Sequence, residues 1–576
     1  MKFKLAMPLK ELKKRTSKSR YKEIKFLSMD SGPVKKLSNE DLLVLCHLTR
    51  AAKKIDEVHM KLEDPRNEEF LQFLNLEIEK GNKKADLAKK MFLSQKSIFS
   101  PDALGNQTTL VVGAEKFAGQ NYFPTDLSKD EFHEILNRML DRGKIEKVKE
   151  ILNQRSIVKR VGDELEAVDF VDAFSEFKEA AHELRLAKEH SSDKKFNEFL
   201  ELQAQALEKA DPMLDAKADK VWATLEKSKF EFTITRECYD ETLSRTIFEN
   251  EELAQRLKDL GICVYTKDNI GARVGIVNKS GTKLLKKLKQ LIDVAEKHMP
   301  YKDKYKRENI ESEVSQTAVD VDLLTLTGEE GSYQASIVTA QNLPNDDKPS
   351  LKIGGGRRNV YHRQVRASIN KKPFKNIIAE DDFKFFNPEA DHWAVICHEN
   401  THTLGPKNGG ALGKYTSILE EYKADMGMYA FLDEFVEAGY FSEDQAKEIM
   451  VTSLSKSFLK GKPSLSQAHR TRSVMICNRM LTEKAIVFGN DEKLHFDFEK
   501  IKKVTKEMMR EVIRIQIDAS AKKAEEYVLR WFNWTEDIEK VAAVIRKHSK
   551  MLNGHLSTPL ADEMLDLSFE KKIEKR

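Results

Sequence analysis

The stretch Trp393-Ala-Val-Ile-Cys-His-Glu-Asn-Thr-His402 contains the pattern H-E-x-x-H and is the most informative part of the chain. On a helix, residues four apart lie on the same face, so His398 and His402 can both reach one metal ion. Glu399, one residue further on, projects beside the two imidazoles toward a water on that metal. The spacing therefore predicts a helix that carries two metal ligands and a general base, as in zinc hydrolases.

A catalytic zinc usually takes three protein ligands, so a third ligand is expected downstream. In the extended metzincin pattern, a glycine three residues after the second histidine turns the chain back toward a third histidine. Gly405 stands at that place, but the residue three positions further on is Asn408, a poor zinc ligand. The other standard arrangement takes a carboxylate from a second helix, and the sequence favours it.

The predicted helix over residues 417–434 offers three such acids, Glu420, Glu421 and Asp425. Glu421 and Asp425 are four residues apart and share a helical face. One of them can bind the metal, while the other, together with Glu420, accepts the second ring N–H of the ligand histidines. Such outer contacts hold the tautomer of each imidazole and raise its basicity.

The composition is typical of a long soluble globular protein, and its small net charge predicts no general attraction to polyanions. The chain has 576 residues, 40% of them hydrophobic and 33% charged, and its net charge is only +4. This length predicts two to four domains or two large lobes. Ten Lys or Arg residues among the first 25 are interpreted as a solvated segment, so neither nucleic acid nor membrane is an expected partner.

Cysteine usage and the N-terminus favour a cytoplasmic location. The five cysteines are scattered and form no C-x-x-C pair, which fits a reducing compartment and indicates neither a disulfide framework nor a thiolate zinc site. The chain as given begins without the apolar core of a signal peptide, and no run of 18 apolar residues occurs.

The periodicity predicts a mainly helical α+β fold. Apolar residues recur at helical spacing from about residue 37 to 225, and residues 118–126 form a loop rich in turn residues. Short β-branched or aromatic runs then predict a small β-sheet or barrel, before helix dominates again from about residue 391. The predicted strands are 230–235, 262–265, 272–277, 319–326 and 336–339, and the later helices are 284–295, 417–434, 470–487, 501–517 and 521–532.

Three further motifs extend the pattern beyond the metal ligands. They are Asn342-Leu-Pro-Asn345, Gln467-Ala-His469 at the start of a predicted helix, and Glu237-Cys-Tyr239 after the first predicted strand. Together with H-E-x-x-H followed by E-E-x-x-A-D, they resemble the dipeptidyl peptidase III family of zinc exopeptidases, over about residues 115 to 490. The best-known members have H-E-x-x-G-H, so this chain is most similar to bacterial or Nudix-associated relatives with the shorter motif.

The resemblance implies a complete catalytic centre. His398, His402 and Glu421 would hold one Zn²⁺ per chain, with Glu420 and Asp425 behind the histidines. Glu399 would act as the general base.

The same resemblance assigns residues to the peptide. His469 and Tyr239 would stabilise the developing oxyanion. Glu237, Asn342 and Asn345 would bind the free α-amine, which limits the product to dipeptides.

The resemblance also implies two lobes around a wide cleft that closes by a hinge. Residues 1–280 and 321–370 would form an N-terminal lobe with the β core and the amine-binding residues. Residues 281–320 and 371–576 would form the helical, zinc-binding catalytic lobe. Short peptides with a free N-terminus are the expected partners, and the chain is expected to be a monomer or weak homodimer.

Two other functions fit the same residues. One is a zinc hydrolase that acts on a substrate other than a peptide. The other is a catalytically weak, zinc-containing protein that binds peptides.

Overall fold

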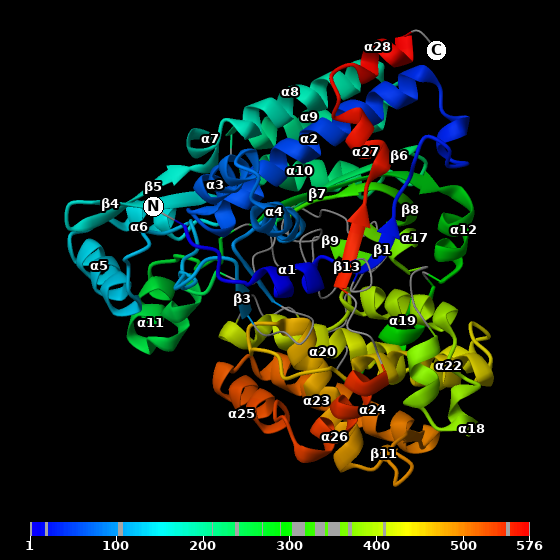
Figure 1. Cartoon of the computed structure of the whole chain (residues 1–576). Helices are drawn as coiled ribbons and strands as arrows, with labels where there is room; N and C mark the ends of the chain where they lie inside the picture. The colour runs from blue at the N-terminus through cyan, green and yellow to red at the C-terminus, as the bar shows by residue number, and fades with distance from the viewer. Residues whose placement is uncertain are drawn as a thin grey trace.

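The structure, a computed structural model, describes residues 3–17, 21–101, 107–209, 211–236, 241–267, 269–288, 290–301, 317–328, 340–343, 358–366, 371–406, 411–548 and 553–574. Two large hydrophobic cores contain most of the buried apolar side chains in these residues. The first core joins the N-terminal helices to a β-sheet, and the second joins the helices that follow residue 377 (Figure 1). The predicted α+β class, mainly helical and in two lobes, is confirmed.

The longest helix of the N-terminal part is α2, Asn39–Glu63. Its first turn is closed by a capping box in which Ser38 and Asp41 each accept from the backbone N–H of the other, satisfying two N–H groups that lack helical partners. Helix α8 lies along α2, and α9 packs in turn on α8 and α10 (Figure 1). The helices of this part are α1 Leu9–Arg15, α3 Asn67–Glu79, α4 Lys83–Gln95, α5 Lys129–Asp141, α6 Ile145–Ile151, α7 Phe170–Ala173, α8 Glu176–His190, α9 Lys194–Lys209, α10 Pro212–Trp222 and α11 Glu251–Asp259.

A five-stranded sheet stands between the two cores, with strand order β6-β7-β8-β10-β9. All neighbouring strands are antiparallel except β8 and β10, which are parallel. Most of its apolar side chains belong to the first core, but Ala340 and Tyr361 at the β9–β10 edge belong to the second. The strands are β6 Phe230–Arg236, β7 Ile270–Asn278, β8 Thr317–Leu326, β9 Ala340–Leu343 and β10 Arg358–His362.

The second core is almost entirely helical. Helices α12 Lys279–Leu288 and α13 Leu291–His298 follow β7 and contribute apolar side chains to it, whereas the short α17 Arg363–Arg366 packs on β8 and belongs to the first core. The second core's own helices are α18 Glu380–Phe383, α19 Pro388–Thr401, α20 Thr416–Tyr429, α21 Leu432–Glu437, α22 Glu443–Ser457, α23 Ala468–Thr482, α24 Phe498–Asp518, α25 Ala521–Trp531 and α26 Glu536–His548. Among the described residues, no helix is both long enough and apolar enough to span a lipid bilayer.

Short elements complete the structure. Two-stranded sheets are formed by β2 Phe99–Pro101 with β3 Gln107–Thr109, β4 Ser156–Val161 with β5 Glu164–Asp169, and β11 Ile486–Phe488 with β12 Leu494–Phe496. Short 3-10 helices lie at Val34–Lys36, Ser244–Glu249, Lys372–Asn376 and Gly413–Tyr415.

Several predicted elements differ from the observed ones, each for a local reason. Residues 262–265 are not a strand, because Ile262 N–H donates to Leu257 O and closes the end of α11. The hairpin β4–β5 interrupts the stretch predicted as helical, with Gly162 turning the chain at φ 61°. The predicted helix 470–487 ends at Thr482, because Lys484 takes a left-handed conformation with φ 53° and β11 follows.

Two other predicted helices are each divided into two. The predicted helix 284–295 corresponds to parts of α12 and α13, and 417–434 to α20 and the start of α21. The predicted loop at residues 118–126 is free of helix and strand, whereas the predicted strand 336–339 lies outside the described residues.

The C-terminal tail returns to the first core. Strand β13, Asn553–Ser557, pairs in parallel with β1, Tyr21–Lys25, and helices α27 Pro559–Met564 and α28 Phe569–Glu574 then pack on α2 (Figure 1). Leu560, Met564 and Phe569 are buried there. The predicted division placed this tail in the zinc lobe, but its apolar face is covered by α2. The other lobe boundaries and the wide cleft stay predictions.

Candidate metal centre

Two imidazoles converge at the C-terminal end of α19. Asn387 caps the helix by accepting from Glu389 N–H at 3.0 Å, and Pro388 occupies its first turn. Four residues apart, His398 and His402 bring their Nε2 atoms within 3.1 Å of each other. Both side chains are buried. The predicted metal helix therefore presents two ring nitrogens to one point.

Glu421 reaches the same point from α20. Its Oε2 lies 3.3 Å from His398 Nε2, and its Oε1 lies 3.8 Å from His402 Nε2. The ligand atoms of His398, His402 and Glu421 all lie within 4.8 Å of one another. A close approach of the two helices makes this possible, because a Cβ on Gly427 of α20 would stand 1.9 Å from Thr401 Oγ1 of α19.

Each histidine is held from behind by a carboxylate. His398 Nδ1 donates to Asp425 Oδ1 at 2.8 Å, and His402 Nδ1 donates to Glu420 Oε1 at 2.9 Å. An ionised carboxylate can only accept, so the proton of each neutral ring lies on Nδ1 and the lone pair on Nε2. The structure thus brings both predicted outer acids to the ring nitrogens that face away from the convergence point.

Two cationic side chains, buried Lys423 and partly buried Arg472, contact these acids, and the sequence analysis missed both. Lys423 Nζ lies 2.8 Å from Glu420 Oε1, and Arg472, from α23, contacts Asp425. The spacing of Glu420 and Lys423 is i, i+3 on a helix, which was a usable signal. Arg472 comes from a distant helix, and nothing in its local sequence indicates the contact.

The arrangement fits a divalent cation. When both histidines are neutral, the Nε2 lone pairs of His398 and His402 and the carboxylate of Glu421 point toward one another. No proton lies between these three groups. Four carboxylates (those of Glu399, Glu420, Glu421 and Asp425) meet only two cationic side chains, Lys423 and Arg472, so acids are in excess. Burying such a surplus is costly without a counter-charge. The donor set of two imidazoles and one carboxylate is also typical of catalytic zinc.

The electrostatics separate the acids into two kinds. Burial favours the neutral form of Glu421, but His469 and His402 outweigh this and hold its pKa well below the usual value. Burial likewise opposes ionisation of Glu420, yet Lys423 and His402 lower its pKa to about 2. In contrast, burial raises the pKa of Glu399, even with both histidines nearby. Glu399 therefore has the greater proton affinity expected of an acid that exchanges protons.

His469 also reaches the centre. It lies in the first turn of α23, with its side chain half exposed, and its Nδ1 is 3.0 Å from Glu421 Oε2. The Q-A-H segment is thus beside the candidate metal ligand.

The predicted amine-binding residues are less fully described. Asn342 lies on the edge strand β9, where its backbone is paired opposite Asn359 of β10. Glu237, Tyr239 and Asn345 lie outside the described residues, so their roles stay predictions.

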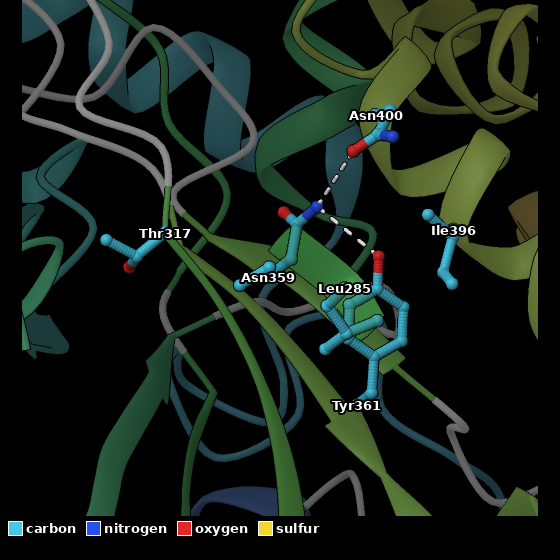
Figure 2. A pocket seen from close by; sticks show the side chains of 7 residues that line it. Leu285, Thr317, Asn359, Tyr361, Ile396 and Asn400 are labelled. Atoms are coloured by element: carbon cyan, nitrogen blue, oxygen red, sulfur yellow. Dashed lines mark hydrogen bonds between the residues drawn. The ribbon is translucent and has the colours of Figure 1, made fainter. Parts of the chain in front are cut away.

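A small pocket lies where α19 and α12 meet strands β8 and β10 (Figure 2). Ile396 and Asn400 line it, and each lies two residues before one of the histidines, about 200° around the helix. Within it, Asn359 Nδ2 donates to Asn400 Oδ1 at 3.3 Å, which joins the sheet to the metal helix (Figure 2). Its labelled lining residues are Leu285, Thr317, Asn359, Tyr361, Ile396 and Asn400.

Comparison with known proteins identifies the fold. The dipeptidyl-peptidase III structure from Caldithrix abyssi matches 96% of this chain and 100% of its own, with TM-score 0.77 and 21% identity. That from Corallococcus sp. strain EGB matches 97% and 98%, with TM-score 0.81 and 19% identity. The chain therefore has the dipeptidyl-peptidase III fold, and the resemblance predicted from the sequence is confirmed at the level of the fold.

Sequence comparison gives a relative of low identity. Nudix hydrolase 3 of Arabidopsis thaliana is 24% identical over 428 residues, which are 69% of this chain and 52% of that protein. The chain thus spans about half the length of this curated relative. No protein-family model matches the chain.

Proposed function

We propose that the chain is a zinc-dependent peptidase that releases dipeptides from the free N-terminus of short peptides. One observation carries the proposal: His398, His402 and Glu421 converge within a fold shared with dipeptidyl-peptidase III structures. The donor set agrees with catalytic zinc, and the surplus negative charge of the group agrees with a divalent cation.

The residues of the chain would share the reaction between them. His398, His402 and Glu421 would hold the ion, which when bound supplies Lewis-acid activation of water and of the scissile carbonyl. Glu399 would take a proton as the carbonyl is attacked and return it to the leaving amine. Its raised pKa supports this role, because a base whose pKa lies nearer neutrality both accepts and releases protons efficiently.

His469 and the sheet edge would bind the substrate. The half-exposed imidazole of His469 contacts Glu421 through Nδ1, and in its imidazolium form it would donate a hydrogen bond to an oxyanion. Tyr239 would be a second donor. Asn342, whose backbone lies on the edge strand β9, would bind the α-amine together with Asn345 and Glu237.

The remaining proposals concern partners and location. Short peptides with a free N-terminus would be the substrates, with no nucleic acid or membrane involved. The protein would act in the cytoplasm as a monomer or weak homodimer.

A panel of dipeptidyl arylamides, assayed with and without a chelator, tests the function. We expect release of the dipeptide by the zinc-loaded protein, loss on chelation, and recovery with added Zn²⁺. N-acetylation of the substrate should lower kcat/KM about 10–150-fold, because a charge-assisted hydrogen bond contributes about 1.5–3 kcal/mol.

The other two functions give different results in the same panel. Equal cleavage of free and acetylated substrates would contradict the amine-binding role. Metal binding with no cleavage of any peptide would favour a hydrolase of another substrate. Tight peptide binding without turnover would favour a binding protein.

A further inference from the structure

Lys423 is buried at the centre of a small polar network behind His402. Its side chain is 3% exposed, and its Nζ lies 2.8 Å from Glu420 Oε1. The same Nζ donates to the backbone carbonyl of Leu404 at 2.6 Å. Glu420 Oε1 also accepts from His402 Nδ1 at 2.9 Å. A single lysine is therefore bonded both to the acid that holds His402 and to the turn that follows His402.

The turn itself is shaped around this lysine. Gly405 has φ 93°, a conformation that favours glycine. A Cβ at this position would stand 3.2 Å from Lys423 Cδ and 3.4 Å from Gln516 Oε1. The glycine that follows the H-E-x-x-H motif in this chain thus leaves space for Lys423, instead of turning the chain toward a third histidine.

Glu420 is held from a second direction as well. Gln516 Nε2, from α24, donates to Glu420 Oε2 at 3.2 Å. With Lys423 and His402 on Oε1, both carboxylate oxygens are engaged. The orientation of Glu420, and through it the ring plane of His402, is therefore set by groups on two helices and one turn.

We propose that Lys423 is a positioning residue of the metal centre, which acts through Glu420 and the Leu404 carbonyl to hold His402 in its ligand orientation. The inference rests on the proposed function only in requiring that the centre binds a divalent cation. Outer contacts of this kind commonly change metal affinity about 10–100-fold when they are removed. Lys423 would touch neither the substrate nor the reacting atoms.

Zinc affinity of the metal-stripped full chain tests the proposal. Competition with a chromogenic chelator should show Lys423→Met binding Zn²⁺ about 10–100-fold more weakly than the wild type. The visible absorption of the Co²⁺-loaded protein should change as well, because the orientation of a ligand changes. Lys423→Arg, which keeps the cation, should recover part of the affinity.

Lys456→Met is the matched control. Lys456 is also paired with a buried acid on the metal helix, Asp391, at 2.5 Å, but it contacts none of the candidate ligands or their acids. Its zinc affinity and Co²⁺ spectrum should equal those of the wild type. An equal loss in both lysine variants would overturn the proposal, because it would show only a general dependence on the stability of α19.

Lys423→Met removes the cation that pairs with Glu420 and can therefore prevent folding. A double variant tests the proposal in that case. Glu420→Gln/Lys423→Met leaves no unpaired charge, and its loss of affinity should be no greater than that of Glu420→Gln alone. Additive losses, or wild-type affinity in Lys423→Met, would refute the positioning role.

If the wild type binds zinc but cleaves no peptide, the proposed function fails while the role of Lys423 is still decided by zinc affinity. If the wild type binds no divalent cation, both fail.

Discussion

Two buried ionic clusters, one in the sheet and one in the helical core, differ in charge balance. In the sheet, Arg358 and Glu231 are fully buried and pair at 2.9 Å. Arg358 also donates to Thr317 Oγ1 and Leu225 O, and Glu231 also accepts from Trp222 and Thr233. Every donor nitrogen and acceptor oxygen of the pair is used, and its net charge is zero.

The cluster around His398 and His402 is not balanced in this way. Its acids outnumber Lys423 and Arg472 by two, and burial raises the pKa of Glu399. Charge balance therefore distinguishes a structural ion pair from a functional cluster. A structural pair is satisfied by its own partners, whereas a cluster with surplus charge and converging lone pairs requires a ligand to complete it.

The largest expected effect is on catalysis. Glu399→Gln should lower kcat for dipeptide release about 10²–10⁴-fold, because it removes the proton acceptor but none of the metal ligands. Bound zinc should stay at the wild-type level, as measured by metal analysis. Glu389→Gln, the same substitution at an exposed site in the first turn of α19, is the control and should keep full activity. A rate near that of the wild type for Glu399→Gln would contradict the assignment of the general base.

The next effect concerns the balanced cluster in the sheet. Arg358→Met should lower the free energy of unfolding by about 3–5 kcal/mol, because it leaves the Glu231 carboxylate buried and unpaired. Urea denaturation of the metal-free protein measures this. Arg363→Met removes the 3.5 Å contact between a half-exposed arginine and Asp322, a buried acid that keeps its hydrogen bond from Asn278, so it should cost less than Arg358→Met. Equal free energies of unfolding in the two variants would show that the pairing of Arg358 with Glu231 does not stabilise the fold.

The smallest expected effect is at the partly exposed ion pair of Lys188 and Glu201, with which the stability changes at the two buried clusters can be compared. The hydrogen bond from Lys188, opposed by partial burial, lowers the pKa of Glu201 to about 2, below the ~4.3 of an unfolded chain. The resulting stability is present above pH ~4.3 and is lost as the pH falls toward about 2. Because solvent screens the pair, Glu201→Gln should cost about 0.2–1 kcal/mol at pH 7 and less at pH 3.

Thermal unfolding of Glu201→Gln and the wild type at these two pH values checks the sign. Glu198→Gln, an exposed site on the same helix, should show no pH-dependent difference. A cost for Glu201→Gln that grows as the pH falls would contradict the direction of the pKa shift.

The sequence predicted the parts of the fold that local pattern controls. Apolar spacing located α24 at about the observed position, and β-branched runs located β6, β7 and β8. It failed where a neighbour far along the chain decides the outcome. The strand β13 is paired with β1, more than 500 residues earlier, and α28 packs on α2. No periodicity within the tail indicates which surface covers it.

The same division holds at the metal centre. The spacing of His398, Glu399 and His402 determined by itself that two imidazoles share a helical face, because helix geometry repeats every 3.6 residues. The spacing of Glu421 and Asp425 likewise placed two acids on one face, without deciding which of them meets the histidines. Only the packing of α20 on α19, with Gly427 against Thr401, brought Glu421 to the ring nitrogens and Asp425 behind His398. Only tertiary structure could place Arg472 and Lys423 behind those acids, because the energy of a buried charge depends on partners that the local sequence does not specify.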